Sequence, residues 1–128
     1  MRKEAEYNWA QARADLATAV TLRDAGVYYA SAFFAQQAAE KALRSASLDS
    51  LHRNPKGHNL VHIADSLNAP LEVMNASAEL NPAFLNTRSP EAANAIPFQL
   101  YDHAAAARHL RAAQIIVDWV KETYVTML

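Results

Sequence analysis

The run of residues 25–39 carries no formal charge, and this feature most constrains how the chain can fold. Good helix formers dominate the stretch 27–44, and neither glycine nor proline interrupts it. A helix that is apolar nearly all round is normally buried among other helices. A membrane span would need about 20 apolar residues, and this run is shorter and contains Gln36 and Gln37. We therefore predict that residues 27–44 form the central helix of a soluble bundle.

Length and composition favour a single helical domain over residues 1–128. Apolar residues make up 52% of the chain, and only two glycines are present. Cysteine is absent, which excludes disulfides and cysteine metal sites and fits a cytoplasmic location. The start, MRKEAEYNW, lacks the apolar segment of a signal peptide. A net charge of −1 gives no overall attraction to a membrane or to nucleic acid, so any RNA contact requires a local patch.

The rest of the chain is also predicted to be helical. Apolar residues at helical spacing predict a first helix over residues 2–25, and Gly26 is placed to end it. The connection to the central helix is so short that the two must be antiparallel neighbours. The central helix fades after Leu43. The later elements are a loop at 52–57, helices from 58 or 59 to 67 and at 71–80, an irregular crossing at 83–97, and a final helix at 98–124.

The predicted fold is all-α, an antiparallel up-and-down bundle of four to five helices. Its predicted core consists of Trp9, Leu16, Phe33, Phe34, Leu43, Leu60, Leu110 and Ile116. The final helix has apolar residues around most of its circumference, namely Ile115, Ile116, Val117, Trp119, Val120 and Tyr124. An exposed apolar patch of more than a few hundred Å² usually marks an interface, so we predict a twofold homodimer.

A polar cluster closes the uncharged run, and its members share one helix face: Gln37, Glu40 and Lys41. The rigid guanidinium of Arg88 is the natural partner for Glu40. One interpretation is structural, with these ion pairs pinning the 83–97 crossing to the bundle. The other is a polar cleft that holds a phosphate or nucleotide, with Arg88, Lys41 and His58 as donors. The structural interpretation is favoured, because ion-pair networks commonly serve stability alone.

The histidines are weaker candidates for a functional site than this polar cluster. His58 and His62 lie four apart, with Asp65 one turn further on, a geometry that suits a divalent metal. The glutamate of an H-E-x-x-H motif is missing, so a structural or surface role is favoured and neither a metal nor another cofactor is predicted. His103 and His109 are six apart and point in different directions on a helix, which argues against paired catalysis.

Several motifs, in order and at characteristic distances, resemble the HEPN domain family. They are Trp9 with Asp15-Leu16, Tyr29 and Phe33 with QAAEKAL at 37–43, GHNL at 57–60, TRSP at 87–90, and Tyr101. The resemblance covers nearly the whole chain. It implies a dimeric bundle of four or five helices, often encoded beside a small nucleotidyltransferase in a toxin–antitoxin pair. It also implies nucleotide binding, and many members are metal-independent endoribonucleases.

The chain departs from the family pattern in two places. Ser89 stands where this branch commonly has an aromatic residue. The ribonuclease branches carry an arginine followed after four to six residues by a histidine at the last helix, and no histidine follows Arg88 or Arg108 at that distance. The only literal match is Arg53 to His58, where intervening proline and glycine preclude a helix and favour a solvated turn.

Two function hypotheses follow. The first is a dimeric nucleotide- or RNA-associated module that works with a nucleotidyltransferase, and the second is a metal-independent endoribonuclease with a composite site at the dimer cleft. The expected ligand-binding residues are Arg88, Lys41, Glu40, Gln37, His58 and Tyr101. The catalytic candidates are Arg88, His58 and His103.

Overall fold

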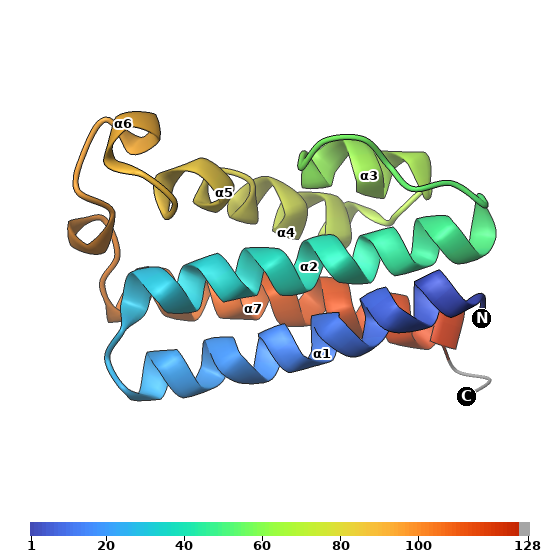
Figure 1. Cartoon of the computed structure of the whole chain (residues 1–128), viewed down its shortest axis with the longest axis horizontal. Coiled ribbons are helices and arrows are strands. Elements are labelled where there is room, and N and C mark those ends of the chain that lie inside the picture. The colour runs from blue at the N-terminus through green and yellow to red at the C-terminus, as the bar shows by residue number, and fades with distance from the viewer. Residues whose placement is uncertain (126–128) are drawn as a thin grey trace.

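Three long helices form the body of the molecule in the computed structural model, which describes residues 1–125. They are α1 (Lys3–Asp24), α2 (Tyr28–Ser50) and α7 (His103–Val120). Figure 1 shows them side by side, with α2 between α1 and the shorter helices α3 to α5. Gly26 links α1 to α2 with a φ of 80°, a conformation that suits glycine because it has no Cβ. The all-α antiparallel bundle predicted from the sequence is confirmed.

The segment between α2 and α7 folds into short helices that pack along α2 and α7. They are α3 (Leu60–Ser66), α4 (Leu71–Leu80), α5 (Ala83–Asn86) and α6 (Pro90–Ala93), followed by a 3₁₀ turn at Pro97–Gln99. The side chain of Asn59 caps α3 by accepting hydrogen bonds from the backbone N–H groups of Val61 and His62. The crossing predicted to be irregular at 83–97 therefore contains two single-turn helices.

Two helix boundaries predicted from the sequence were wrong. The central helix does not fade after Leu43 but continues to Ser50, because Ser45 and Ser47 are buried and tertiary packing overrides the modest helix propensity of serine. The final helix begins at His103 instead of residue 98, where Asp102 caps it by accepting a hydrogen bond from the N–H of Ala105. A π-helical turn at Lys121–Val125 follows it.

Small side chains make the centre of the bundle. Buried alanines on α1 and α2 let these two helices approach closely, namely Ala12, Ala19, Ala35, Ala39, Ala42 and Ala46. Five of the large residues predicted for the core are buried: Trp9, Leu43, Leu60, Leu110 and Ile116. Leu16, Phe33 and Phe34 are only partly buried, which corrects the prediction for these three. Leu16 and Phe34 nevertheless pack against the core.

The bundle core takes up the apolar residues of the last helix. Ile116, Val117 and Val120 are buried in the core, and Ile115, Trp119 and Tyr124 pack against it. This helix therefore lacks the spare apolar face from which a dimer was predicted. The exposed large apolar residues lie elsewhere: Tyr7, Val27, Tyr29, Leu51, Leu71, Leu85, Ile96, Phe98 and Leu100. Among residues 1–125, no helix combines the length and hydropathy that a membrane span requires.

Candidate functional site

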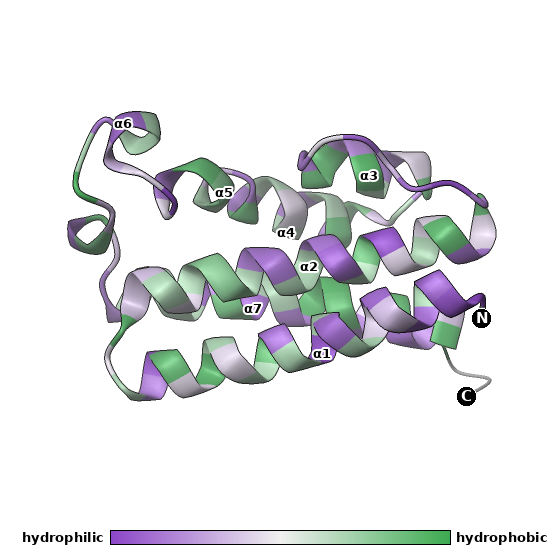
Figure 2. Cartoon of the chain, in the orientation of Figure 1, coloured by the Kyte–Doolittle hydropathy of each residue, from purple (hydrophilic) through white to green (hydrophobic). Residues whose placement is uncertain are grey.

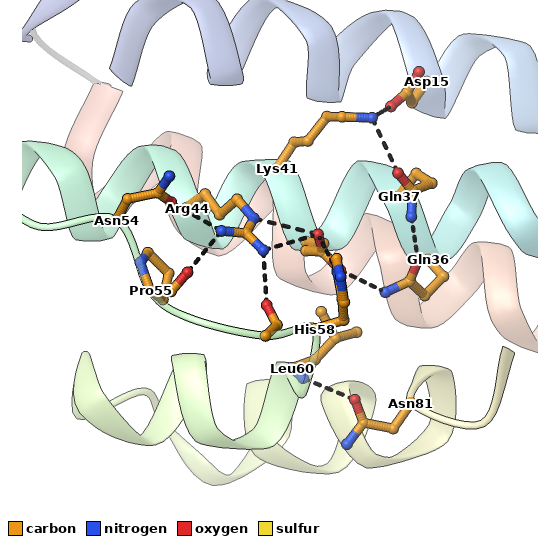
Figure 3. A network of polar contacts seen from close by, with 12 residues as sticks. Asp15, Gln36, Gln37, Lys41, Arg44, Asn54, Pro55, His58, Leu60 and Asn81 are labelled. Atoms are coloured by element: carbon orange, nitrogen blue, oxygen red, sulfur yellow. Dashed lines mark hydrogen bonds and ion pairs between the residues drawn. The ribbon is translucent and has the colours of Figure 1, made fainter. Parts of the chain in front are cut away.

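A buried carboxylate, Glu40, is the centre of an extended polar network. Its side chain lies 3.2 Å from Nε of Arg44, 3.1 Å from Nε2 of Gln36 and 3.0 Å from Nδ1 of His58. Figure 3 shows these contacts where α2 meets the loop before α3. A buried carboxylate is costly unless it is paired, and here three side chains from two elements satisfy it. Glu40 therefore ties α2 to the following loop.

The predicted pairing of Glu40 with Arg88 was wrong. Arg44 takes that place because it stands one turn along the same helix, at the i,i+4 distance that brings side chains together. Arg44 also donates hydrogen bonds to Oδ1 of Asn54 and to the backbone carbonyls of Pro55 and Gly57. The network thus pins the loop at 52–57, and it reaches the 83–97 crossing through the stacking of His58 on Phe84 instead of through an ion pair with Arg88.

Lys41 belongs to a second part of the same network. Its Nζ lies 2.6 Å from Oδ2 of Asp15 and 3.3 Å from Oε1 of Gln37, and Gln37 continues the chain of contacts to Gln36. Asp15 is buried where α1 packs against α2. The signal that could have found it is its spacing of three and four residues from the buried Ala12 and Ala19. Lys41 therefore joins two helices and does not face a ligand cleft.

The main cleft lies at the other end of α2, beside the turn at Gly26. It has a volume of about 540 Å³ and is lined by Gly26, Val27, Tyr28, Tyr29, Thr87, Arg88, Pro97, Phe98 and Tyr101. Of the predicted ligand-binding residues, Arg88 and Tyr101 lie here, whereas Gln37, Glu40, Lys41 and His58 do not. Three aromatic lining residues were not assigned to the site from the sequence: Tyr28, Tyr29 and Phe98. Their only signal is the gathering of aromatic residues near two breaks in helical structure.

Arg88 lies against an aromatic ring at the cleft. Its guanidinium carbon is 4.4 Å from the centroid of the Phe84 ring, and it forms no ion pair with another residue in the described part of the chain. The imidazole of His58 also stacks on Phe84, with ring centroids 4.0 Å apart and planes inclined by 17°. A ring stacked so closely covers its face, so Arg88 must take the opposite face. A guanidinium placed over a ring still has N–H groups available for an anion.

The remaining histidines fall into separate places. His103 meets the cleft residue Tyr28 edge-on at 5.7 Å, whereas His109 is buried in α7 and meets Tyr101 edge-on at 5.5 Å. His62 lines a groove beside the loop at 52–57, whereas His58 contacts Glu40. Within residues 1–125, no three histidine, aspartate or glutamate side chains gather as metal ligands. The segment from Arg53 to His58 is a loop, as the sequence predicted.

Burial changes the acid–base properties of two residues beside the cleft. Burial raises the pKa of the Tyr101 phenol, and a hydrogen bond with Asn86 opposes the change. Burial lowers the pKa of the His109 imidazole below its ordinary 6.5, and the charge of Glu79 opposes this in part. Tyr101 therefore stays a neutral hydrogen-bonding group at physiological pH, and His109 stays a neutral ring in the core.

The lowered pKa of His109 predicts acid sensitivity. Below pH 6.5 the unfolded chain binds a proton at this residue more readily than the folded protein, so the free energy of unfolding falls as the pH drops. The contribution is fully present above pH 6.5 and is lost with a slope of at most about 1.4 kcal/mol per pH unit. Urea unfolding between about pH 5 and 8 measures it. His109→Leu should flatten the profile, whereas the exposed His62→Leu should leave it unchanged; equal profiles for all three proteins would contradict the prediction.

Comparisons with known proteins agree on one family. A family model described as the HEPN domain matches residues 5–123. TT1696 from Thermus thermophilus is 29% identical with a TM-score of 0.86, covering 94% of this chain and 98% of that one. ST0689, an archaeal HEPN homologue, is 24% identical with a TM-score of 0.78, covering 95% and 98%. A HEPN domain protein from Thermotoga maritima is 24% identical with a TM-score of 0.71, covering 91% and 95%. No curated protein matches significantly.

Proposed function

This chain belongs to the HEPN domain family, and from that membership we propose that it is a nucleotide-binding module whose site is the cleft around Arg88. The observation that carries the proposal is an exposed arginine without an ion-pair partner in residues 1–125, held against Phe84 at the mouth of an aromatic cleft. A guanidinium can give two parallel hydrogen bonds to one phosphate, which makes Arg88 the anchor for the anionic part of the ligand.

The walls of the cleft suit the rest of a nucleotide. Tyr28, Tyr29, Phe98 and Tyr101 supply flat aromatic surface for a base, and the neutral phenol of Tyr101 supplies a hydrogen bond. The volume of about 540 Å³ falls within the range of small-molecule sites. A base stacked between aromatic rings, with its phosphate on Arg88, would use both halves of the lining.

We propose further that the module acts as a homodimer and with a nucleotidyltransferase in a toxin–antitoxin-type pair. Exposed apolar residues stand in or near the cleft-lining segments, namely Val27, Tyr29, Ile96, Phe98 and Leu100. Such residues are candidates for burial under another protein. A second subunit or the nucleotidyltransferase placed on this rim would close the cleft and exclude water from the bound nucleotide.

Arg88→Lys should weaken nucleotide binding at least about tenfold while leaving the melting temperature nearly unchanged. Lysine keeps the charge but loses the planar pair of donors and the stacking on Phe84. Calorimetric titration with ATP measures the affinity, and thermal unfolding measures the stability of the same sample. Arg111→Lys, at an exposed position on α7 outside the cleft, is the matched control.

Two outcomes would overturn the nucleotide site. Unchanged ATP affinity in Arg88→Lys would place the ligand elsewhere. A clear fall in melting temperature, with no ATP binding by the unaltered protein, would make Arg88 a structural clamp that holds α5 through Phe84.

A metal-independent endoribonuclease is the second candidate, and the position of His103 favours it. The His103 ring contacts Tyr28, a residue of the cleft wall, and so stands near the space that Arg88 faces. A histidine there could take the proton of a ribose 2′-hydroxyl while Arg88 stabilises the negative phosphate. Cleavage of labelled RNA in the presence of EDTA, lost in His103→Ala, would support this function; RNA left intact by the unaltered protein would exclude it.

A further inference from the structure

The end of the molecule opposite the Arg88 cleft carries a group of basic side chains from two distant segments. The start of α1 contributes Arg2 and Lys3, and the loop after α2 with α3 contributes His52, Arg53, Lys56 and His62. Nη1 of Arg2 lies 3.2 Å from Nδ1 of His52, which brings the two segments together. Figure 2 shows both segments strongly hydrophilic, with the loop lying against α3 and the start of α1 near the end of α2.

The loop that carries Arg53 and Lys56 is held in one conformation by hydrogen bonds from α2. Arg44 donates hydrogen bonds of 2.7–2.8 Å to Asn54, Pro55 and Gly57, and Glu40 balances the charge of Arg44 itself. The loop is therefore organised without using its own outward cations. A ligand that binds such a surface loses little free energy in ordering it.

Two adjoining grooves run along these basic residues. One, of about 420 Å³, is lined by Arg53, Lys56 and His62, and the other, of about 480 Å³, by Arg2 and His52. Arg53 and Asn54 line both grooves, so the two form one continuous track. Glu4 is the single acidic residue of the track lining, and Arg2, Arg53 and Lys56 form no ion pair with another described residue. The track is thus locally positive although the chain is not.

An exposed aromatic ring stands in the same track. Tyr7 lines the groove that contains Arg2 and is 61% exposed. The ammonium of Lys3 lies 5.8 Å from the centroid of its ring. A tyrosine on a helix surface gains little from such exposure unless a flat partner covers it. Aromatic rings beside a row of cations are the combination with which proteins hold unpaired bases and their phosphates.

We propose that this track binds single-stranded nucleic acid, with successive phosphates on Arg53, Lys56 and Arg2 and a base stacked on Tyr7. A row of cations suits the repeated charge of a phosphodiester chain better than one isolated phosphate, and the exposed ring distinguishes a nucleic acid from an acidic peptide. The track is a different site from the Arg88 cleft, because the residues that line its two grooves include none of those that line the cleft. It does not depend on the nucleotide function proposed above.

Fluorescence anisotropy with a fluorescein-labelled twelve-nucleotide oligouridylate at about 50 mM salt tests the proposal. The double variant Arg53→Glu/Lys56→Glu should bind at least about tenfold more weakly, and its dependence of log Kd on log salt should be shallower by about 1.4, because two phosphate contacts are lost. Tyr7→Ala should bind severalfold more weakly with an unchanged salt dependence, since stacking releases no counterions.

The control Arg108→Glu/Arg111→Glu makes the same change of net charge on α7, outside both grooves, and should retain the affinity of the unaltered protein. The double variant Arg53→Glu/Lys56→Glu should keep the ATP affinity of the unaltered protein, because neither residue lines the Arg88 cleft, so failure of the nucleotide site and failure of the track are separate results. Three results would overturn the proposal: no oligouridylate binding by the unaltered protein, equal weakening by the α7 control, or equally tight binding of polyglutamate. Circular dichroism melts of every variant confirm that the proteins compared are folded.

Discussion

Glu40→Ala is expected to lower the free energy of unfolding by about 3–5 kcal/mol, the usual cost of removing one partner from a buried ion pair. Glu40 is 5% exposed, and its removal leaves the Arg44 guanidinium without its carboxylate in a largely buried position. Nε2 of Gln36, a fully buried side chain, loses its acceptor as well. Urea denaturation of the unaltered and variant proteins at neutral pH measures the difference.

Glu79→Ala is the matched control. Glu79 also pairs with an arginine, Arg108, but both side chains are about half exposed, and such pairs contribute at most about 1 kcal/mol. If Glu40→Ala costs no more than Glu79→Ala, the buried network is not what fixes the 52–57 loop to α2. Limited proteolysis gives a second measurement, because loss of Glu40 should also increase cleavage within the 52–57 loop.

The second large effect is expected at the centre of α2. Leu43→Ala should destabilise the protein by about 2–5 kcal/mol, because Leu43 is fully buried and truncation leaves a cavity. Leu43 belongs to the same buried cluster as Trp9, Leu60 and Ile116, so the cavity would lie inside the core. Chemical denaturation monitored by tryptophan fluorescence measures the loss, since Trp9 is part of the same core.

Leu51→Ala provides the comparison for the same substitution on an exposed site. Leu51 follows the end of α2 and is 37% exposed, so its truncation should cost clearly less. Phe34→Ala should also lower the free energy of unfolding by less than the roughly 3–5 kcal/mol expected for a fully buried aromatic residue. The reason is that Phe34 is only partly buried, although it packs against the core. If Leu43→Ala destabilises the protein no more than Leu51→Ala does, the assignment of Leu43 to the core is wrong.

Much of the fold could be predicted because its signals are local. The uncharged run at 25–39 has to be buried on most sides, and helix formers without a breaker leave one backbone conformation that does so. Gly26 and Asn59 act on their own turns: the first reverses the chain and the second caps α3. Boundaries without a strong local signal failed, as at Ser45 to Ser50, where burial against other helices keeps modest helix formers helical.

The candidate site, like the fold, could be predicted from the sequence only in part. Arg88 and Tyr101 were picked from the sequence and do share a cleft, but the aromatic residues around them come from two segments about seventy residues apart, 26–29 and 97–101. Only the tertiary structure brings those segments together, because no local pattern encodes which loop meets which helix end.

The partners of the charged residues were decided in the same way. From the sequence alone, Arg88 was the predicted partner of Glu40, but other cations along the chain meet the same requirement. The fold selects Arg44 and His58 for Glu40, Asp15 for Lys41 and Phe84 for Arg88. The sequence by itself determined that a carboxylate on the buried helix α2, Glu40, must be paired, since an unpaired charge is costly to bury. The tertiary structure determined which residues form each pair. The distances between side chains on different helices decide this, and they exist only once the bundle has formed.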